Sequence, residues 1–222
     1  MPFQDNKVEL IGWYGGDEAH ALSAWTSTSR DLTREKRERI PSLLKMLASN
    51  GHETPFEKSS LHFLVTVDTA THIHFLKHRI GVSVNGESAR YKELKGDKYL
   101  VPEDWPLAEK AKYIAFMEDA IMRYHETLKR LMDEGIDRKR AKESARFYLP
   151  YGNQVTLDVM FNWRSFNHFL GLRMKPDAQK EVRDIAKQML QLVGEIPGSP
   201  FRHTIDAFGL SDEIAERFHP PY

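Results

Sequence analysis

Residues 61–91, LHFLVTVDTATHIHFLKHRIGVSVNGESARY, carry a strand pattern, a helix start and a glycine-hinged loop in direct succession. The strand has four apolar positions that alternate with polar ones: Leu61, Phe63, Val65 and Val67. Asp68 or Thr69 can cap the helix that follows. The apolar face of that helix has four residues: Ala70, Ile73, Leu76 and Ile80. Gly81 and Gly86 disfavour helix, so we expect the helix to end near Arg79 and a loop to follow.

The same two patterns recur along the chain and indicate its fold class. Alternation predicts further strands around Val8 and over 155–161. Helical spacing predicts helices over 34–47, 107–132, 137–149, 166–170 and 182–193. Because strands are few and do not alternate regularly with helices, we predict an α+β fold. We expect one domain over 1–222, with a small mixed or antiparallel sheet packed by long helices and with 201–222 as a C-terminal tail.

Composition excludes several functional classes. The 222 residues include no cysteine, which rules out disulfides, thiolate metal sites and cysteine nucleophiles. Lys plus Arg and Asp plus Glu both total 32, so a nucleic-acid partner is not expected. The N-terminal MPFQDNKVELIG lacks the apolar core of a signal peptide, and no apolar run is long enough to span a membrane. We therefore expect a soluble, cytoplasmic protein without a membrane partner.

The loop within 77–91 concentrates groups that bind anions. Arginine offers a planar fork of donors for phosphate or carboxylate oxygens, and loop glycines and serines add further donors. Glu87 would repel a bare phosphate but suits a ligand that also presents donors, so the set indicates a nucleotide. The alternative is that the basic residues of 77–79 interact with a helix C-terminus.

Two other chemistries are open at the same place. His74 and His78 are four residues apart on the predicted helix and could share a face, as metal ligands do, which would suit a metal-dependent hydrolase. Ser88 could be a nucleophile, but its context, GESAR, does not match the GxSxG elbow. We assign no metal site.

Four segments together resemble the flavin-dependent thymidylate synthases. They are GHETPFE at 51–57, KHRIGVSVNGESARY at 77–91, ARFYLP at 145–150 and NWRSFNHFLGLR at 162–173. They follow one another along the chain in the same order as in that family. The resemblance implies methylation of dUMP to dTMP in the cytoplasm. Methylenetetrahydrofolate would be the carbon donor, FAD reduced by NADPH the hydride source, and the protein a homotetramer with shared active sites. The absence of cysteine agrees, because a flavin hydride needs no protein nucleophile.

The resemblance also implies residue roles. Those matched to dUMP contacts are His74, Lys77, Glu87, Ser88, Ala89, Arg90, Arg146 and Arg173. Those matched to FAD contacts are His52, Thr54, Lys77, His78, Arg79, Glu87, Asn162, Arg164 and His168. Arg173 is the implied catalytic residue, since a cation beside the uracil imide favours its ionised form.

Several of these residues have simpler alternative roles. Asn162 could cap the next helix, Arg146 could lie at a helix C-terminus, and Arg173 could pair with Asp177. Thr54 and Glu57 could cap a loop between helix and strand.

Some positions depart from the family pattern. Lys77 stands where arginine is usual, His74 where glutamine is frequent and His168 where asparagine is frequent, and the loop between Arg79 and Ser88 is one residue longer. Two further functions therefore stay open: methylation or hydroxymethylation of another pyrimidine nucleotide, and nucleotide-dependent regulation without turnover.

Overall fold

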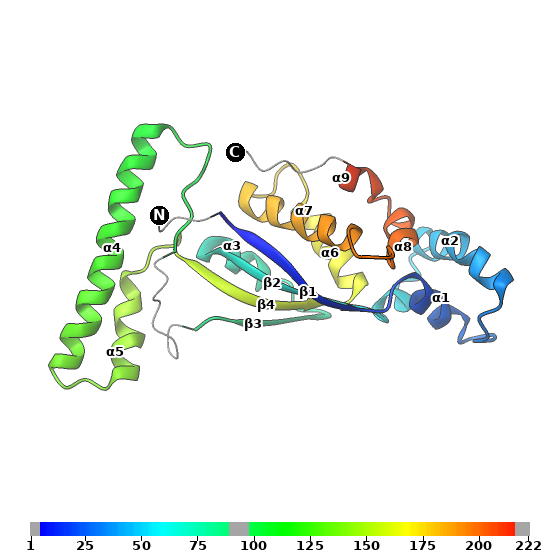
Figure 1. Ribbon diagram of the computed structural model, residues 1–222, viewed down its shortest axis with the longest axis horizontal. Coiled ribbons are helices and arrows are strands. Elements are labelled where there is room, and N and C mark those ends of the chain that lie inside the picture. The colour runs from blue at the N-terminus through cyan, green and yellow to red at the C-terminus, as the bar shows by residue number, and fades with distance from the viewer. Residues whose placement is uncertain (1–4, 89–97, 216–222) are drawn as a thin grey trace. The chain divides into compact units, whose positions relative to one another are not determined.

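The computed structural model describes residues 5–88 and 98–215, and Figure 1 shows its ribbon. The described strands are β1 (Lys7–Tyr14), β2 (Ser60–Asp68), β3 (Val82–Gly86) and β4 (Gln154–Phe161). The longer helices are α1 (Asp17–Trp25), α2 (Arg34–Ser49), α4 (Leu107–Asp133), α5 (Arg138–Ala145), α6 (Trp163–Arg173) and α7 (Lys180–Gly194). The shorter helices are α3 (Thr69–Phe75), α8 (Arg202–Ala207) and α9 (Ser211–Ala215), with 3-10 turns η1 (Thr54–Glu57) and η2 (Arg146–Tyr148).

The four strands form one sheet in the order β1-β2-β4-β3. Strands β3 and β4 are antiparallel. Two backbone hydrogen bonds between them show this, because the residue numbers rise along β3 while they fall along β4. Asn162 N donates to Gly81 O at 3.4 Å, and Glu87 N donates to Thr156 O at 2.8 Å. A small sheet accompanied by long helices confirms the predicted α+β class.

The described residues group into two compact units, each built from several chain segments. Unit 1 comprises the described residues within 1–7, 65–76 and 85–157, and unit 2 those within 8–64, 77–84 and 158–222. Each strand of the sheet has residues in both units, so the chain passes between them repeatedly. The organisation of 1–222 as a single domain stays a prediction.

Unit 2 contains an aromatic core between its strands and α6. Phe63 on β2 stacks on Phe166 of α6 with ring centroids 5.7 Å apart. Phe161 on β4 lies 5.3 Å from Phe169, one turn further along α6. All four rings are at most 1% exposed. Aromatic pairs in this range add to the stability that area burial provides, so α6 is held firmly on the sheet.

A second core region of unit 2 joins α1, η1 and α8 through a buried histidine. His20 is fully buried, and its two ring nitrogens lie 2.9 Å from Ser59 Oγ and 3.0 Å from Thr204 Oγ1. Phe56 of η1 packs edge-on against His20, with centroids 5.2 Å apart. These contacts fix the position of η1 in the unit.

Unit 1 is dominated by the helical hairpin of α4 and α5, which Figure 1 shows side by side. Tyr124 and Leu128 of α4 pack with Ala141 and Ala145 of α5 in one buried cluster. Asp137 caps α5 by accepting hydrogen bonds from Lys139 N and Arg140 N, as the sequence predicts.

Several elements differ from the sequence predictions. Asp68 caps α3 as expected, but the helix ends at Phe75 and not near Arg79. The segment predicted as a loop contains strand β3 over Val82–Gly86. Helices α1, α8 and α9 were not predicted, and α8 and α9 lie in the segment expected to be a tail.

Candidate functional site

The predicted site residues divide between the two units. Unit 2 contains His52, Thr54, Lys77, His78, Arg79, Asn162, Arg164, His168 and Arg173. Unit 1 contains His74, Glu87, Ser88 and Arg146. Ala89 and Arg90 lie outside the described residues. The residues expected to bind flavin, except Glu87, thus belong to one compact unit.

In unit 2, Arg173 at the end of α6 contacts His78. Arg173 Nε donates a hydrogen bond of 3.0 Å to His78 Nε2. Because a guanidinium has donors and no acceptor, His78 Nε2 carries no proton in this arrangement and the imidazole is in its Nδ1–H form. His78 is 7% exposed and packs edge-on against Phe169, with centroids 5.0 Å apart. The ring is therefore a fixed acceptor that orients the guanidinium.

The surroundings of Arg173 also weaken its hold on a proton. Burial lowers the pKa of Arg173 below its ordinary value, because a charged group loses hydration there. The side chain still carries its charge at neutral pH, since arginine stays protonated in proteins. Its described contact is to a neutral ring, so the positive charge at this end of α6 is not cancelled by His78.

The backbone that precedes β3 is fastened to the start of α6. Asn162 Oδ1 accepts from Ser165 N at 2.8 Å, which confirms that Asn162 caps α6. Ser165 Oγ donates to Ile80 O at 2.7 Å. Gly81 has φ of +66°, and a Cβ there would lie 2.2 Å from Ser165 Oγ. Glycine is therefore required at 81 for this close approach.

Arg164, the second residue of α6, is paired with two carboxylates of the GHETPFE segment. Its Nε lies 2.7 Å from Glu53 Oε2, and its Nη1 lies 2.7 Å from Glu57 Oε1. The hydrogen bond to Glu57, followed by that to Glu53, raises the pKa of Arg164 above its ordinary value. Sequence reasoning missed Glu53 and assigned Glu57 only a capping role. Their four-residue spacing, with a proline turn between them, is the signal that could have suggested one shared cation.

The GHETPFE segment forms one side of a cavity of about 470 Å³ within unit 2. Gly51 ends α2 with φ of +66°, and His52 N then donates to Leu47 O at 2.9 Å. This turn places two exposed residues, His52 and Thr54, on the cavity. Its lining consists of Ser23, Ala24, Trp25, Ser27, Thr28, Leu43, Met46, Leu47, His52, Thr54 and Pro55. Apolar walls with a few hydroxyls and one imidazole suit a flat heteroaromatic ligand.

Unit 1 holds four of the predicted nucleotide residues, His74, Glu87, Ser88 and Arg146. Glu87 follows β3, and its Oε2 accepts from Thr156 N at 3.2 Å. Arg146 is exposed at the C-terminus of α5, the position that its helix-end alternative requires. His74 is half-buried on α3.

The structure does not place His74 and His78, the candidate metal ligands, on the same helix. His74 lies on α3, whereas His78 follows the helix end at Phe75 and belongs to the other unit. The four-residue spacing therefore does not place the two imidazoles on one helical face. Among the described residues, no group of three or more His, Asp or Glu side chains could hold a metal ion.

No helix in the described part of the chain combines the length and the apolar character that a bilayer span requires.

Comparisons with known proteins place the chain in a family. Residues 9–197 match the family model described as thymidylate synthase complementing protein. The flavin-dependent thymidylate synthase of Streptomyces avermitilis is 30% identical over 211 residues, which cover 86% of this chain and 84% of that protein. The Geobacter sulfurreducens enzyme of the same name is 31% identical over 194 residues, covering 84% and 81%.

Solved structures agree with this placement. A UMP/dUMP methylase, PolB from Streptomyces cacaoi, bound with 5-Br dUMP, superposes with a TM-score of 0.78 at 27% identity, covering 96% of this chain and 99% of that one. The same protein bound with 5-Br UMP gives a TM-score of 0.77. The chain belongs to the thymidylate synthase complementing protein family, the family of flavin-dependent thymidylate synthases that the four sequence motifs predict.

Proposed function

We propose that the protein is a flavin-dependent thymidylate synthase that methylates dUMP to dTMP, with FAD as cofactor, NADPH as reductant and methylenetetrahydrofolate as carbon donor. The observation that carries the proposal is the arrangement along α6. Arg164 near its start contacts the GHETPFE segment, and Arg173 at its end contacts His78 of the KHRIG segment. Three of the four family motifs thus converge on one helix of unit 2.

The residues of this unit fit a flavin. The cavity beside His52 and Thr54 has apolar walls and hydroxyl donors, and Arg164 of α6 is paired with Glu57 of the η1 turn. When bound, the flavin supplies the hydride, so the chain itself needs no nucleophile, in agreement with its lack of cysteine. His52, Thr54, Lys77, Arg79, Asn162, Arg164 and His168 would hold the cofactor.

Arg173 would act on the pyrimidine. A cation beside the uracil imide favours loss of the N3 proton and raises electron density at ring carbon 5, where the methyl group is added. His78 orients the guanidinium through its Nε2 without neutralising it. The remaining dUMP contacts would come from Lys77, Glu87, Ser88, Ala89, Arg90, Arg146 and His74.

Self-association would complete the site. Arg146 is followed by aromatic side chains with large exposed fractions: Phe147 at 83%, Tyr148 at 46% and Tyr151 at 68%. Exposed aromatic surface of this kind is typical of interfaces. It supports a homotetramer in which Arg146 reaches a neighbouring subunit's site. Light scattering on the purified protein would give the oligomeric mass.

The test is conversion of dUMP under defined conditions. Purified protein incubated with FAD, NADPH, methylenetetrahydrofolate and dUMP should yield dTMP, identified by mass spectrometry, and omission of any component should abolish the product. Absorbance at about 450 nm should fall when NADPH reduces the flavin and recover on turnover. A protein that binds dUMP but never reoxidises reduced flavin would instead be a regulator.

UMP is a second candidate substrate. The PolB structures that this chain resembles are of a UMP/dUMP methylase with either brominated nucleotide bound. Parallel reactions with UMP and dUMP would decide between them, and methylation of UMP at the higher kcat/KM would replace dUMP as the assigned substrate.

A further inference from the structure

The loop between α1 and α2, residues 26–33, forms one wall of the cavity in unit 2. Trp25, Ser27 and Thr28 line the cavity on this side. The other lining residues come from α1, α2 and the 52–55 segment. The end of α1 and the short loop after it therefore form part of the cavity lining.

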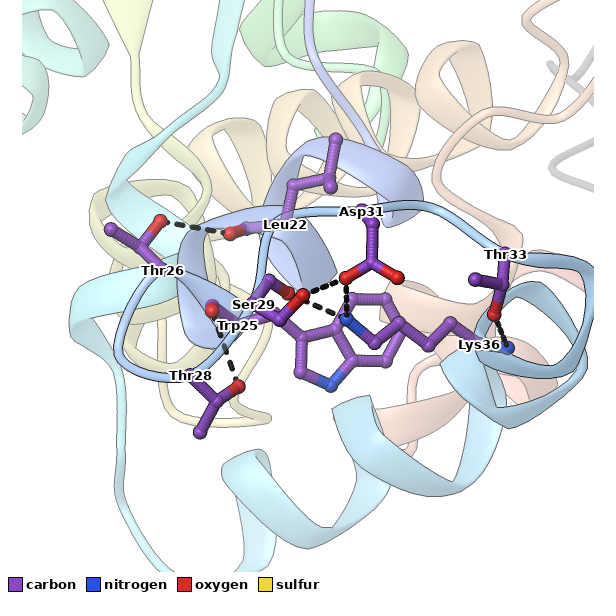
Figure 2. A network of polar contacts seen from close by, with 8 residues as sticks. All are labelled: Leu22, Trp25, Thr26, Thr28, Ser29, Asp31, Thr33 and Lys36. Carbon is purple, nitrogen blue, oxygen red and sulfur yellow. Dashed lines mark hydrogen bonds and ion pairs between the residues drawn. The ribbon is translucent and has the colours of Figure 1, made fainter.

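The first half of the loop is fastened to the end of α1 by side-chain hydrogen bonds. Thr26 Oγ1 donates to Leu22 O at 3.0 Å, and Thr28 Oγ1 donates to Trp25 O at 3.3 Å. Both acceptors are carbonyl groups of the last turn of α1, and Trp25 O also accepts from Thr28 N at 2.9 Å. They set the direction in which the chain leaves α1, as Figure 2 shows.

Lys36 of α2 holds the second half of the loop, and within that half Ser29 Oγ donates to Asp31 Oδ1. Its Nζ donates to Ser29 O at 2.6 Å and to Asp31 Oδ1 at 2.8 Å. The same ammonium lies 5.2 Å from the centroid of the Trp25 ring, within cation–π range. Figure 2 shows the Lys36 chain extending across the indole to these acceptors. Lys36 therefore contacts both the tryptophan of the wall and the backbone that follows Thr28.

The surroundings of Lys36 differ from those of a surface lysine. Its side chain is 19% exposed, and removing an ammonium from water is unfavourable unless it is paired. The hydrogen bond from Lys36 lowers the pKa of Asp31, which shows that the carboxylate is favoured in its charged form here. Thr33 caps α2 by accepting from Lys36 N at 3.3 Å, which fixes the residue at the first turn of the helix.

We propose that Lys36 is a positioning residue for the cofactor. It holds Trp25, Ser27 and Thr28 in place so that the cavity accepts a flat aromatic ring system of FAD. This inference rests on the proposed function, because it requires that the cavity beside His52 and Thr54 belongs to the flavin site.

The experiment compares three lysine variants. Lys36→Met keeps an apolar chain against Trp25 but removes the ammonium, and Lys36→Arg restores a cation able to donate to Ser29 O and Asp31. Lys45→Met is the matched control, since Lys45 is exposed on the same helix and does not line the cavity. Flavin fluorescence would give the Kd for FAD, calorimetry the Kd for dUMP, and thermal unfolding the Tm. Trypsin cleavage after Arg30, within the loop, would report its mobility without any ligand.

We expect Lys36→Met to raise the Kd for FAD about 10-fold, which corresponds to about 1.4 kcal/mol of binding free energy. Cleavage after Arg30 should accelerate in this variant, while the Kd for dUMP stays within a factor of about two. Lys36→Arg should restore most of the FAD affinity, and Lys45→Met should match the wild type in every measurement.

Three outcomes would overturn the inference. FAD affinity in Lys36→Met equal to that of Lys45→Met would show that the loop does not position the cofactor. Parallel losses in FAD affinity, dUMP affinity and Tm would show that Lys36 only stabilises the fold. A wild-type protein that bound no FAD would overturn the proposed function itself, and with it the positioning role of Lys36.

Discussion

The two ends of α6 each present an arginine, but in opposite electrostatic settings. Arg164, near the start, is exposed and paired with Glu53 and Glu57, which raise its pKa. Arg173, at the end, is half-buried and bonded to a neutral imidazole, and burial lowers its pKa. The first cation is paired with two carboxylates, whereas the second donates to an imidazole and lies in a less hydrated place. We therefore propose that Arg164 organises the GHETPFE turn and that Arg173 acts on the substrate.

The largest effect should follow loss of Arg173. We expect Arg173→Ala to lower the rate of dTMP formation by about 100- to 1,000-fold, because an electrostatic group aimed at developing charge contributes on that scale. The Kd for dUMP should rise by less than about 10-fold, because other predicted contacts would still hold the phosphate. Single-turnover kinetics and calorimetry would measure the two quantities. An equal loss in both would make Arg173 a simple anchor.

A smaller effect should follow loss of the acceptor that orients Arg173. We expect His78→Leu to reduce turnover by about 10-fold, because an oriented hydrogen bond to a charged group contributes on this scale. His78→Gln, whose amide oxygen can accept from Arg173 Nε, should recover part of the loss. Equal activities of the two variants would show that His78 does not work through this bond.

We expect low pH to destabilise the region around η1 first, because Phe56 of η1 packs against the buried ring of His20. Burial lowers the pKa of His20 to about 3, so the folded state binds fewer protons than the unfolded state below about pH 6.5. Stability from this group is therefore complete above pH 6.5 and is lost as pH falls, by at most about 1.4 kcal/mol per pH unit. Urea unfolding at several pH values should show a steeper loss in the wild type than in His20→Gln.

The contribution of Asp17 to stability changes with pH in the opposite direction to that of His20. The His20→Gln variant is therefore needed as a reference. Burial raises the pKa of Asp17, so the folded state keeps this proton to higher pH and gains stability as pH falls. Subtraction of the His20→Gln curve removes the Asp17 contribution common to both proteins. Parallel curves for wild type and variant would contradict a neutral, buried His20.

The smallest effect should follow removal of the carboxylates around Arg164. The double variant Glu53→Gln, Glu57→Gln frees one cation and removes two negative charges near the proposed cofactor site. We expect its Kd for FAD to fall about threefold at low ionic strength, with the gain disappearing at high salt. Weaker FAD binding in the double variant would show that the carboxylates orient Arg164 for the flavin and do not compete with it.

The sequence predicted elements whose patterns are local. Alternation in 61–67 and the Asp68 cap identify β2 and the start of α3, and both are present. Helix α1 escaped prediction because two of its four buried residues, Asp17 and His20, are polar and hide the apolar face. Strand β3 escaped because Gly81 and Gly86 suggest a loop, while pairing with β4 provides its hydrogen bonds.

The candidate site was predictable to the same extent: its residues could be recognised locally, but their partners could not. Residue types at His52, Arg164 and Arg173 indicated the family and its cofactor, and Asn162 was recognised as a possible cap. The partners were not predictable, because Arg164 and Glu53 are 111 positions apart and Arg173 and His78 are 95 apart. Such pairs are set by packing of α6 on the sheet, for which no local pattern exists.

The most direct test compares Arg173→Ala with Arg164→Ala in one assay, the rate at which dUMP and methylenetetrahydrofolate reoxidise the reduced flavin at saturating FAD. If the two ends of α6 differ as proposed, Arg173→Ala slows this rate by about 100-fold or more, and Arg164→Ala by less than about 10-fold. A larger loss in Arg164→Ala, or equal losses, would contradict the assignment of the substrate-activating charge to Arg173.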